Sequence, residues 1–168
     1  MLKFAGTLKA MLYAMGLTHD MIEGHLKEEP LDMLCGRTPR WAMQSLGTDW
    51  GRKLMGEDLW VRLWQFKAQG LLDAGSKIVV DDVRFQNEAR AIKEMGGVLV
   101  RVTRPGYGGG THASETELAG ISTDLQIDND GTIDQLEQTV DGLIEWLRDY
   151  DFKTMRSVAA ITTGAIHS

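Results

Sequence analysis

An acidic pair followed by an arginine stands near the middle of the sequence, at the end of an apolar run. Asp81 and Asp82 come directly after the β-branched residues 78–80, and Arg84 follows after Val83. Parallel sheets bind ligands outside the carboxyl ends of their strands, where a carboxylate can hold magnesium and an arginine can grip a phosphate. The alternative is structural, with Asp82 capping the following turn and Arg84 pairing with it. The pattern therefore predicts either a phosphate and magnesium site or a capped turn.

A second cluster surrounds a predicted helix start. The pair Thr38-Pro39 has the hydroxyl N-cap and first-turn proline of a helix N-terminus, and Arg37 and Arg40 flank it. Unpaired N–H groups and the helix dipole favour an anion there, so two added guanidinium groups predict a monophosphate site. Trp41 and Trp50 either stack on a base or belong to the core, and tryptophan at helical spacing is more often core.

Two further segments, 104–112 and 126–137, partly match known types of ligand-binding loop. The glycine-rich segment 104–112 is either a lid over a phosphate donor, with Arg101 or Arg104 neutralising charge, or a plain surface loop. It is not a phosphate-cradling loop, because the motif G-x-x-x-x-G-K-[ST] occurs nowhere in the 168 residues. The segment 126–137 nearly matches a calcium loop, but Gln126 takes the first ligand position and a strand precedes it. We interpret that segment as a strand, a turn and a capped helix.

Hydrophobic periodicity indicates the elements that must position these side chains. Alternation of apolar runs with amphipathic segments is typical of right-handed βαβ units, so we predict an α/β fold of three αβα layers with a mainly parallel sheet. We assign residues 1–152 to one domain and residues 153–168 to a C-terminal tail. The predicted helices cover residues 4–16, 38 to 46 or 53, 57–74 and 87–95, with further helices opening at Ser114 and Thr132 and a short one within 17–37; the predicted strands cover 77–83, 98–103 and 125–127, with 158–161 as a further candidate.

Composition narrows the class of partner. A formal net charge of −6 argues against general nucleic-acid binding, and no apolar run reaches the ~18 residues of a membrane span. The single cysteine, Cys35, cannot form an internal disulfide and fits a reducing cytoplasm. Glu23 has the pattern of a solvated position, and no histidine has a partner at metal-ligand spacing, His19 included. We therefore expect a cytoplasmic protein with a small-molecule or protein partner.

Taken in order, these segments resemble the deoxynucleoside monophosphate kinases of bacteriophages and prophages. The resemblance implies a P-loop nucleotide-kinase fold that transfers the γ-phosphoryl group of ATP, with magnesium, to a deoxynucleoside 5′-monophosphate. The stretches that carry it are FAGTLK (4–9), TPRW (38–41) with Gln44, LGTDWGR (46–52), DLWV (58–61), VDDVRFQNEA (80–89), Arg101 with Arg104, HASE (112–115) and IDNDGTIDQL (127–136).

The resemblance also implies roles for particular residues. The acceptor nucleotide would be bound by Arg37, Arg40, Gln44 and Arg52, beside the Trp41 ring. Catalytic roles near the phosphates would fall to Asp82, Arg84 and, from the lid, Arg104, with Asp82 also holding the metal.

The sequence departs from the family pattern at its start. Family members begin with a strand, a glycine-rich loop ending in lysine and serine or threonine, and a helix, and we expect this fold to lack all three. Without that loop, ATP-dependent turnover by this chain is expected to be negligible. In such a fold the first strand is central, so its two neighbours would have unpaired edges. Re-pairing, the segment 158–161, or an edge from a second copy or a protein partner would close the sheet.

Two functions remain open at this point. One is a phage-type deoxynucleotide kinase-like enzyme in the cytoplasm of a bacterial host. The other is a non-catalytic binding or inhibitory protein that descends from such a kinase and acts on a host or phage protein.

Overall fold

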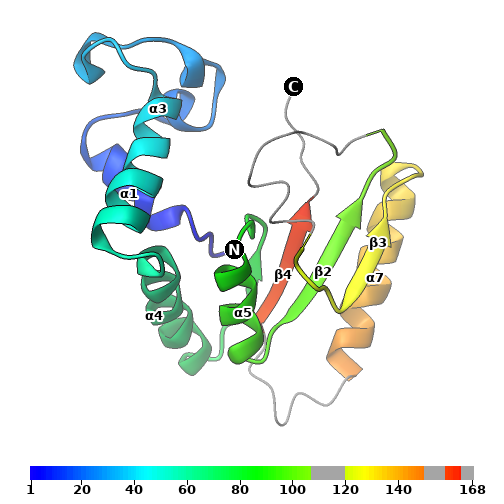
Figure 1. The fold of residues 1–168 in the computed structure, drawn as a ribbon. Coiled ribbons are helices and arrows are strands. Elements are labelled where there is room, and N and C mark those ends of the chain that lie inside the picture. Colours follow the sequence, from blue (N-terminus) through cyan, green and yellow to red (C-terminus); the bar gives the residue numbers. More distant parts are fainter. Residues whose placement is uncertain (107–119, 150–157, 164–168) are drawn as a thin grey trace. The chain divides into compact units, whose positions relative to one another are not determined.

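The computed structural model describes residues 1–106, 120–149 and 158–163, with the backbone alone described at 148–149 and 158–163. The chain forms two compact units, one of residues 4–67 and one of residues 1–3 and 68–168 (Figure 1). Within the described ranges, no helix combines the length and the apolar character that crossing a membrane requires.

The unit of residues 4–67 is built from helices around a small apolar core. Helices predicted over 4–16, from Thr38 onward and over 57–74 are confirmed. The Phe4 ring stacks on Trp64 with centroids 4.5 Å apart, and Leu8 and Leu12 of the first helix form a core cluster with Trp60. Its elements are α1 (Gly6–Ala14), α2 (His19–Ile22), the 3-10 helices η1 (His25–Glu28) and η2 (Asp32–Leu34), α3 (Pro39–Gln44), the π-helix η3 (Ser45–Met55) and most of α4 (Leu59–Asp73).

The second unit contains the parallel sheet that the sequence predicts. Its strands lie in the order β1-β4-β2-β3, and every pairing between them is parallel. Parallel strands require crossover connections, and described helices lie in two of them, one after the first strand and one before the last. The elements are β1 (Ile78–Val80), α5 (Gln86–Glu94), β2 (Val98–Thr103), β3 (Leu125–Asp128), α7 (Ile133–Asp149) and β4 (Val158–Thr163).

The last strand of the sequence occupies a central position in the sheet. Ala159 of β4 pairs with Val79 on one side and with Val98 on the other. The candidate strand 158–161 is therefore confirmed, and it closes the sheet between β1 and β2. It lies beyond residue 152, so part of the segment assigned to the tail belongs to the sheet. At the outer side of β1, the Leu2 amide donates to the Val79 carbonyl over 2.9 Å.

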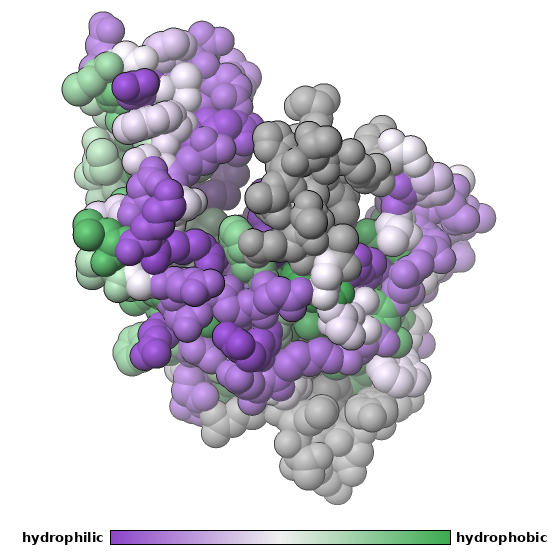
Figure 2. All heavy atoms as spheres, in the orientation of Figure 1, coloured by the Kyte–Doolittle hydropathy of each residue, from purple (hydrophilic) through white to green (hydrophobic). Residues whose placement is uncertain are grey.

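Helices cover the sheet on its two faces. In Figure 1, α5 lies in front of the sheet and α7 behind it, as right-handed crossovers in opposite directions require. The inner side of α5 is apolar, with Ala89, Ala91 and Ile92 buried. Its outer side carries exposed polar residues such as Arg90 and Lys93, and Figure 2 shows hydrophilic spheres over this helix.

Part of the glycine-rich segment cannot be placed in this description. Arg104 is described and exposed, directly after β2. Residues 107–112 and the helix predicted to open at Ser114 lie outside the described residues.

Candidate functional site

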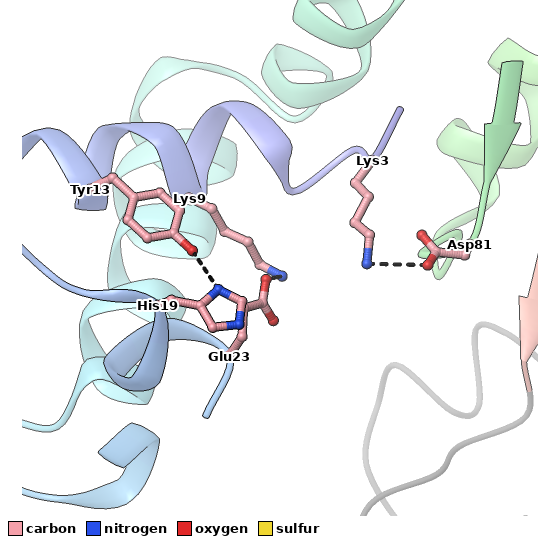
Figure 3. Close-up of polar contacts among 6 residues, drawn as sticks. All are labelled: Lys3, Lys9, Tyr13, His19, Glu23 and Asp81. Atoms are coloured by element: carbon pink, nitrogen blue, oxygen red, sulfur yellow. Dashed lines mark hydrogen bonds and ion pairs between the residues drawn. The ribbon is translucent and has the colours of Figure 1, made fainter. Parts of the chain in front are cut away.

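The acidic pair lies where the sequence places it, at the carboxyl end of β1. The strand ends at Val80, and the Asp81 and Asp82 side chains follow, both half-buried. Lys3 Nζ lies 3.1 Å from Asp81 Oδ2, and Figure 3 draws this ion pair. The other oxygen, Asp81 Oδ1, is buried and has no hydrogen-bond partner in the described part of the chain. A buried carboxylate oxygen left in this way is suited to a hard cation.

Asp81 and Asp82 are two consecutive carboxylates at the carboxyl end of β1. Among the described residues, no group of three or more His, Cys, Asp and Glu side chains is placed to hold a metal ion. Magnesium usually takes one or two protein carboxylates and completes its shell with water and substrate phosphates. Asp81 and Asp82 could supply that share, and they leave the remaining positions to ligands outside the protein.

The turn after the acidic pair is capped by Glu88, which the sequence did not single out. Its side chain is 4% exposed, and Oε2 accepts hydrogen bonds from the Arg84 amide over 2.8 Å and the Phe85 amide over 3.1 Å. Two backbone donors at the start of α5 are thus already bound to a carboxylate. An anion near this turn would therefore depend on the exposed Arg84 side chain more than on the helix N-terminus.

Three predicted residues come together at the start of α3. The N-cap is confirmed, because Thr38 Oγ1 accepts a hydrogen bond from the Trp41 amide over 3.1 Å. The Arg37 guanidinium lies 4.9 Å from the centroid of the Trp41 ring, in a cation–π contact. Arg40 forms an ion pair with Glu28. Arg37 and Trp41 therefore contact each other at the start of α3, and Arg40 of the same helix turn is paired with Glu28.

The two tryptophans of this region differ in burial. Trp50 is half-buried, packs against the apolar core and tilts against the Trp60 ring at 51° with centroids 6.1 Å apart. Trp41 is 48% exposed. The core alternative is therefore correct for Trp50, whereas Trp41 presents its ring at the surface.

The helix from Pro39 continues to Met55, two residues beyond its longer predicted end. It changes from α to π winding at Ser45, so the LGTDWGR stretch lies in η3. Gln44 is exposed, and Arg52 is half-buried, with Nη1 donating to the Glu57 carbonyl over 3.4 Å.

The predicted site residues are distributed over both units. Residues of the acceptor group lie in the helical unit, and those of the catalytic group lie in the sheet unit. Their assembly into one site stays a prediction. The helical unit holds Arg37, Arg40, Trp41, Gln44 and Arg52, and the sheet unit holds Asp82, Arg84 and Arg104.

A polar cluster on α1 and α2 was not predicted. Lys9 Nζ lies 2.5 Å from Glu23 Oε1, and Tyr13 Oη lies 3.4 Å from His19 Nδ1 (Figure 3). Glu23 therefore belongs to an ion pair and is exposed, which agrees with its interpretation as a solvated position. The available signal was spacing. Lys9 and Tyr13 lie four positions apart on α1, and Glu23, just after the end of α2, lies four positions after His19.

The segment between β3 and α7 forms the predicted turn and capped helix. The Thr132 amide donates to Gln135 Oε1 over 2.8 Å, and the Gln135 amide donates to Thr132 Oγ1 over 3.3 Å. Asp128 accepts hydrogen bonds from Thr103 Oγ1 at 2.5 Å and Gln126 Nε2 at 2.7 Å, and these lower the pKa of its carboxyl. A cavity of about 430 Å³ lies against residues 128–139.

Comparison with known proteins assigns the chain to a family. A family model described as deoxynucleotide monophosphate kinase matches residues 21–140. The chain belongs to this family. The match contains every predicted site residue from Arg37 to Arg104, whereas β4 lies outside it.

Individual members of the deoxynucleotide monophosphate kinase family give the same result. A protein of Acanthamoeba polyphaga mimivirus, provisionally named a deoxynucleotide monophosphate kinase, is 38% identical over 65% of this chain and 62% of its own length. The deoxynucleotide monophosphate kinase of Enterobacteria phage T4 is 33% identical over 58% of this chain and 41% of its own. That of Escherichia phage RB69 is 29% identical over 62% and 44%. The chain thus spans about half the length of these relatives. No solved structure gives a significant match.

Proposed function

We propose that this chain binds a deoxynucleoside 5′-monophosphate at the start of α3, as the acceptor of a phosphoryl group. The observation that carries the proposal is the exposed Trp41 ring with the Arg37 guanidinium over it and Arg40 one position away. A planar ring can stack on any base, and guanidinium groups bind phosphate bidentately. These residues lie within the matched family region, and the named relatives are kinases of deoxynucleotide monophosphates.

Binding at this place needs only a local exchange of partners. Arg40 pairs with Glu28, and the two side chains are 40% and 59% exposed. An exposed ion pair contributes roughly 0–1 kcal/mol, so a phosphate dianion can displace Glu28 at little cost. The Arg37 guanidinium lies over the Trp41 ring, on which the base of the nucleotide would stack. We propose that Arg37 turns toward the phosphate when the base stacks on Trp41.

The sheet unit would serve the phosphoryl donor. ATP with magnesium is the donor that the family resemblance implies, and the Asp81–Asp82 pair suits one magnesium ion, with Asp82 as the ligand we favour. The exposed Arg84 and Arg104 side chains would contact phosphate oxygens. Magnesium, when bound, would neutralise charge on the transferring phosphate. We propose that the protein acts in the cytoplasm of an infected cell.

For these 168 residues assayed alone, we propose monophosphate binding without measurable ATP turnover. No G-x-x-x-x-G-K-[ST] motif occurs among them, and Glu88 already holds two amide donors at the start of α5. A role as a non-catalytic binding protein for a host or phage protein is the second candidate, and the same missing motif favours it. Closing the sheet needs no partner, since β4 of the same chain fills the centre.

Titration calorimetry with dAMP, dGMP, dCMP and dTMP tests the binding proposal. We expect Trp41→Ala to weaken binding roughly 5- to 150-fold, because stacking of a base on an aromatic ring is worth about 1–3 kcal/mol. Trp146→Ala is a matched control, because Trp146 lies on α7 and is also 48% exposed. No binding by the wild-type chain, or equal effects of the two substitutions, would refute the proposal.

A kinase assay with ATP and magnesium tests the proposed lack of ATP turnover. Turnover by the 168-residue chain would refute the proposed lack of catalysis and leave the binding proposal standing. If no monophosphate binds and a purified host protein does, the second candidate function replaces the first.

A further inference from the structure

The π-helix η3 is unusual in its length. It covers 11 residues, Ser45–Met55, and the Gly56 amide donates to the Gly51 carbonyl over 3.0 Å, five residues back. π winding is rare and mostly limited to single turns, many of them at functional sites. A longer π segment therefore requires a tertiary contact that stabilises this winding over the α-helical one.

Trp60 supplies that contact from the start of α4. Its indole Nε1 donates to the Gly47 carbonyl over 2.8 Å, and the side chain is 5% exposed. A buried indole N–H needs an acceptor, and here a backbone carbonyl of the helix provides it.

The same indole ring lies directly against Gly51. A Cβ atom added to Gly51 would come within 2.5 Å of Trp60 Nε1 and 2.6 Å of Cε2 and Cζ2. On the same helix, a Cβ atom at Gly47 would come within 2.9 Å of Leu8 Cδ1. The two glycines of the LGTDWGR stretch thus permit side chains of α4 and α1 to reach the backbone of η3.

From these contacts we infer that Trp60 is a positioning residue for the monophosphate site, an inference that rests on the proposed function. Arg52, which the family resemblance assigns to the acceptor nucleotide, follows Gly51 directly, so its direction depends on the winding that Trp60 stabilises. A change of winding by one residue turns the following side chains by about 100° around the helix axis. Loss of the Trp60 contact would therefore redirect Arg52 while leaving its charge in place.

Trp64 allows this role to be separated from ordinary core packing. It lies one turn further along α4, is 2% exposed and stacks on Phe4. Replacing either tryptophan with phenylalanine keeps an aromatic ring in the core. Only Trp60→Phe also removes the hydrogen bond to the Gly47 carbonyl.

The test compares Trp60→Phe with Trp64→Phe at a temperature where both variants are folded. In Trp60→Phe we expect a five- to tenfold weaker affinity for the deoxynucleoside monophosphates by calorimetry. We also expect amide hydrogen exchange at Gly56 to become at least tenfold faster. Trp64→Phe should change neither by more than twofold. Equal behaviour of the two variants would overturn the inference.

The variant Gly51→Ala provides an independent test of the Trp60 contact, and hydrogen exchange provides a test that does not require the ligand. Gly51→Ala leaves Trp60 intact but pushes its ring away, so it should shift affinity and Gly56 exchange in the same direction as Trp60→Phe. If the wild-type chain binds no monophosphate, the proposed function fails. Amide hydrogen exchange at Gly56 would still show whether Trp60 stabilises the π winding of η3. Unchanged exchange in Trp60→Phe and in Gly51→Ala would overturn that role of Trp60.

Discussion

Replacing glycine with alanine should have opposite effects on stability at two positions, Gly51 and Gly70. The substitution at Gly51 tests the packing of Trp60 against η3. Gly51→Ala gains about 1 kcal/mol of helix propensity. The new methyl group would lie 2.5–2.6 Å from three atoms of the buried Trp60 ring. Overpacking of a filled core costs about 1–3 kcal/mol, and three simultaneous clashes place this site toward the upper end. We expect a net loss of about 1–2 kcal/mol.

The matched control is Gly70→Ala. Gly70 lies within α4, is exposed, and a Cβ atom added there would meet nothing within 4 Å. Alanine should therefore stabilise the helix by about 0.5–1 kcal/mol. For a chain of this size, 1 kcal/mol shifts Tm by about 2–4 °C. Calorimetric melting should show Gly51→Ala lowered by about 2–8 °C and Gly70→Ala raised by about 1–4 °C.

The two substitutions can also contradict this reasoning. A Tm for Gly51→Ala at or above the wild-type value would mean that the indole does not press on η3. A further check combines Gly51→Ala with Trp60→Leu, whose smaller side chain removes the clash. The added loss from alanine should then largely disappear, because effects of contacting residues are not additive.

Three further outcomes follow from single contacts in the sheet unit. Glu88→Ala should lose about 1–3 kcal/mol in urea unfolding by leaving two amides of a turn unpaired, whereas Glu94→Ala, exposed on the same helix, should stay within about 0.5 kcal/mol. Hydrogen bonds from Thr103 and Gln126 lower the pKa of Asp128, so its stabilising contribution is complete above the ordinary value of 3.8 and is lost as pH falls through the folded pKa. Thr103→Val should therefore raise the pKa of Asp128 toward 3.8 in an NMR titration, and an unchanged pKa would exclude this cause. Ending the chain after residue 149 removes β4 and should abolish cooperative unfolding of the sheet unit, which circular dichroism would follow; a sharp transition like that of the full chain would contradict its central place.

Elements with strong periodicity were predictable from the sequence, and features set by tertiary contact were not. The strand 98–103 has the predicted bounds, because a mostly apolar, β-branched run between two glycines and a proline leaves little alternative. The helix from Thr38 was predictable at its start, where the N-cap is local. Its π winding was not, because it depends on Trp60 reaching back over 13 positions to Gly47.

The candidate site shows the same division. Arginines beside a helix start pointed to the cluster at α3, and the structure brings Arg37 onto the Trp41 ring. The sequence could not distinguish Trp41 from Trp50, because both have helical spacing and only the fold decides which ring the core covers. Likewise Glu88, three positions after Phe85, has the spacing of a cap, but its burial follows from packing of α5 on the sheet.

The position of β4 links the sheet to the proposed phosphate chemistry. All four strands are parallel, so their carboxyl ends lie along one edge of the sheet. The register pairs Val80, the last residue of β1, with Ala160, and Val102 of β2 with Thr163. The end of β4 therefore lies between the strand that leads into Asp82 and the strand that leads into Arg104. Any ligand that contacts both of those side chains must pass over a strand that lies outside the family match, so β4 belongs in every functional experiment on this chain.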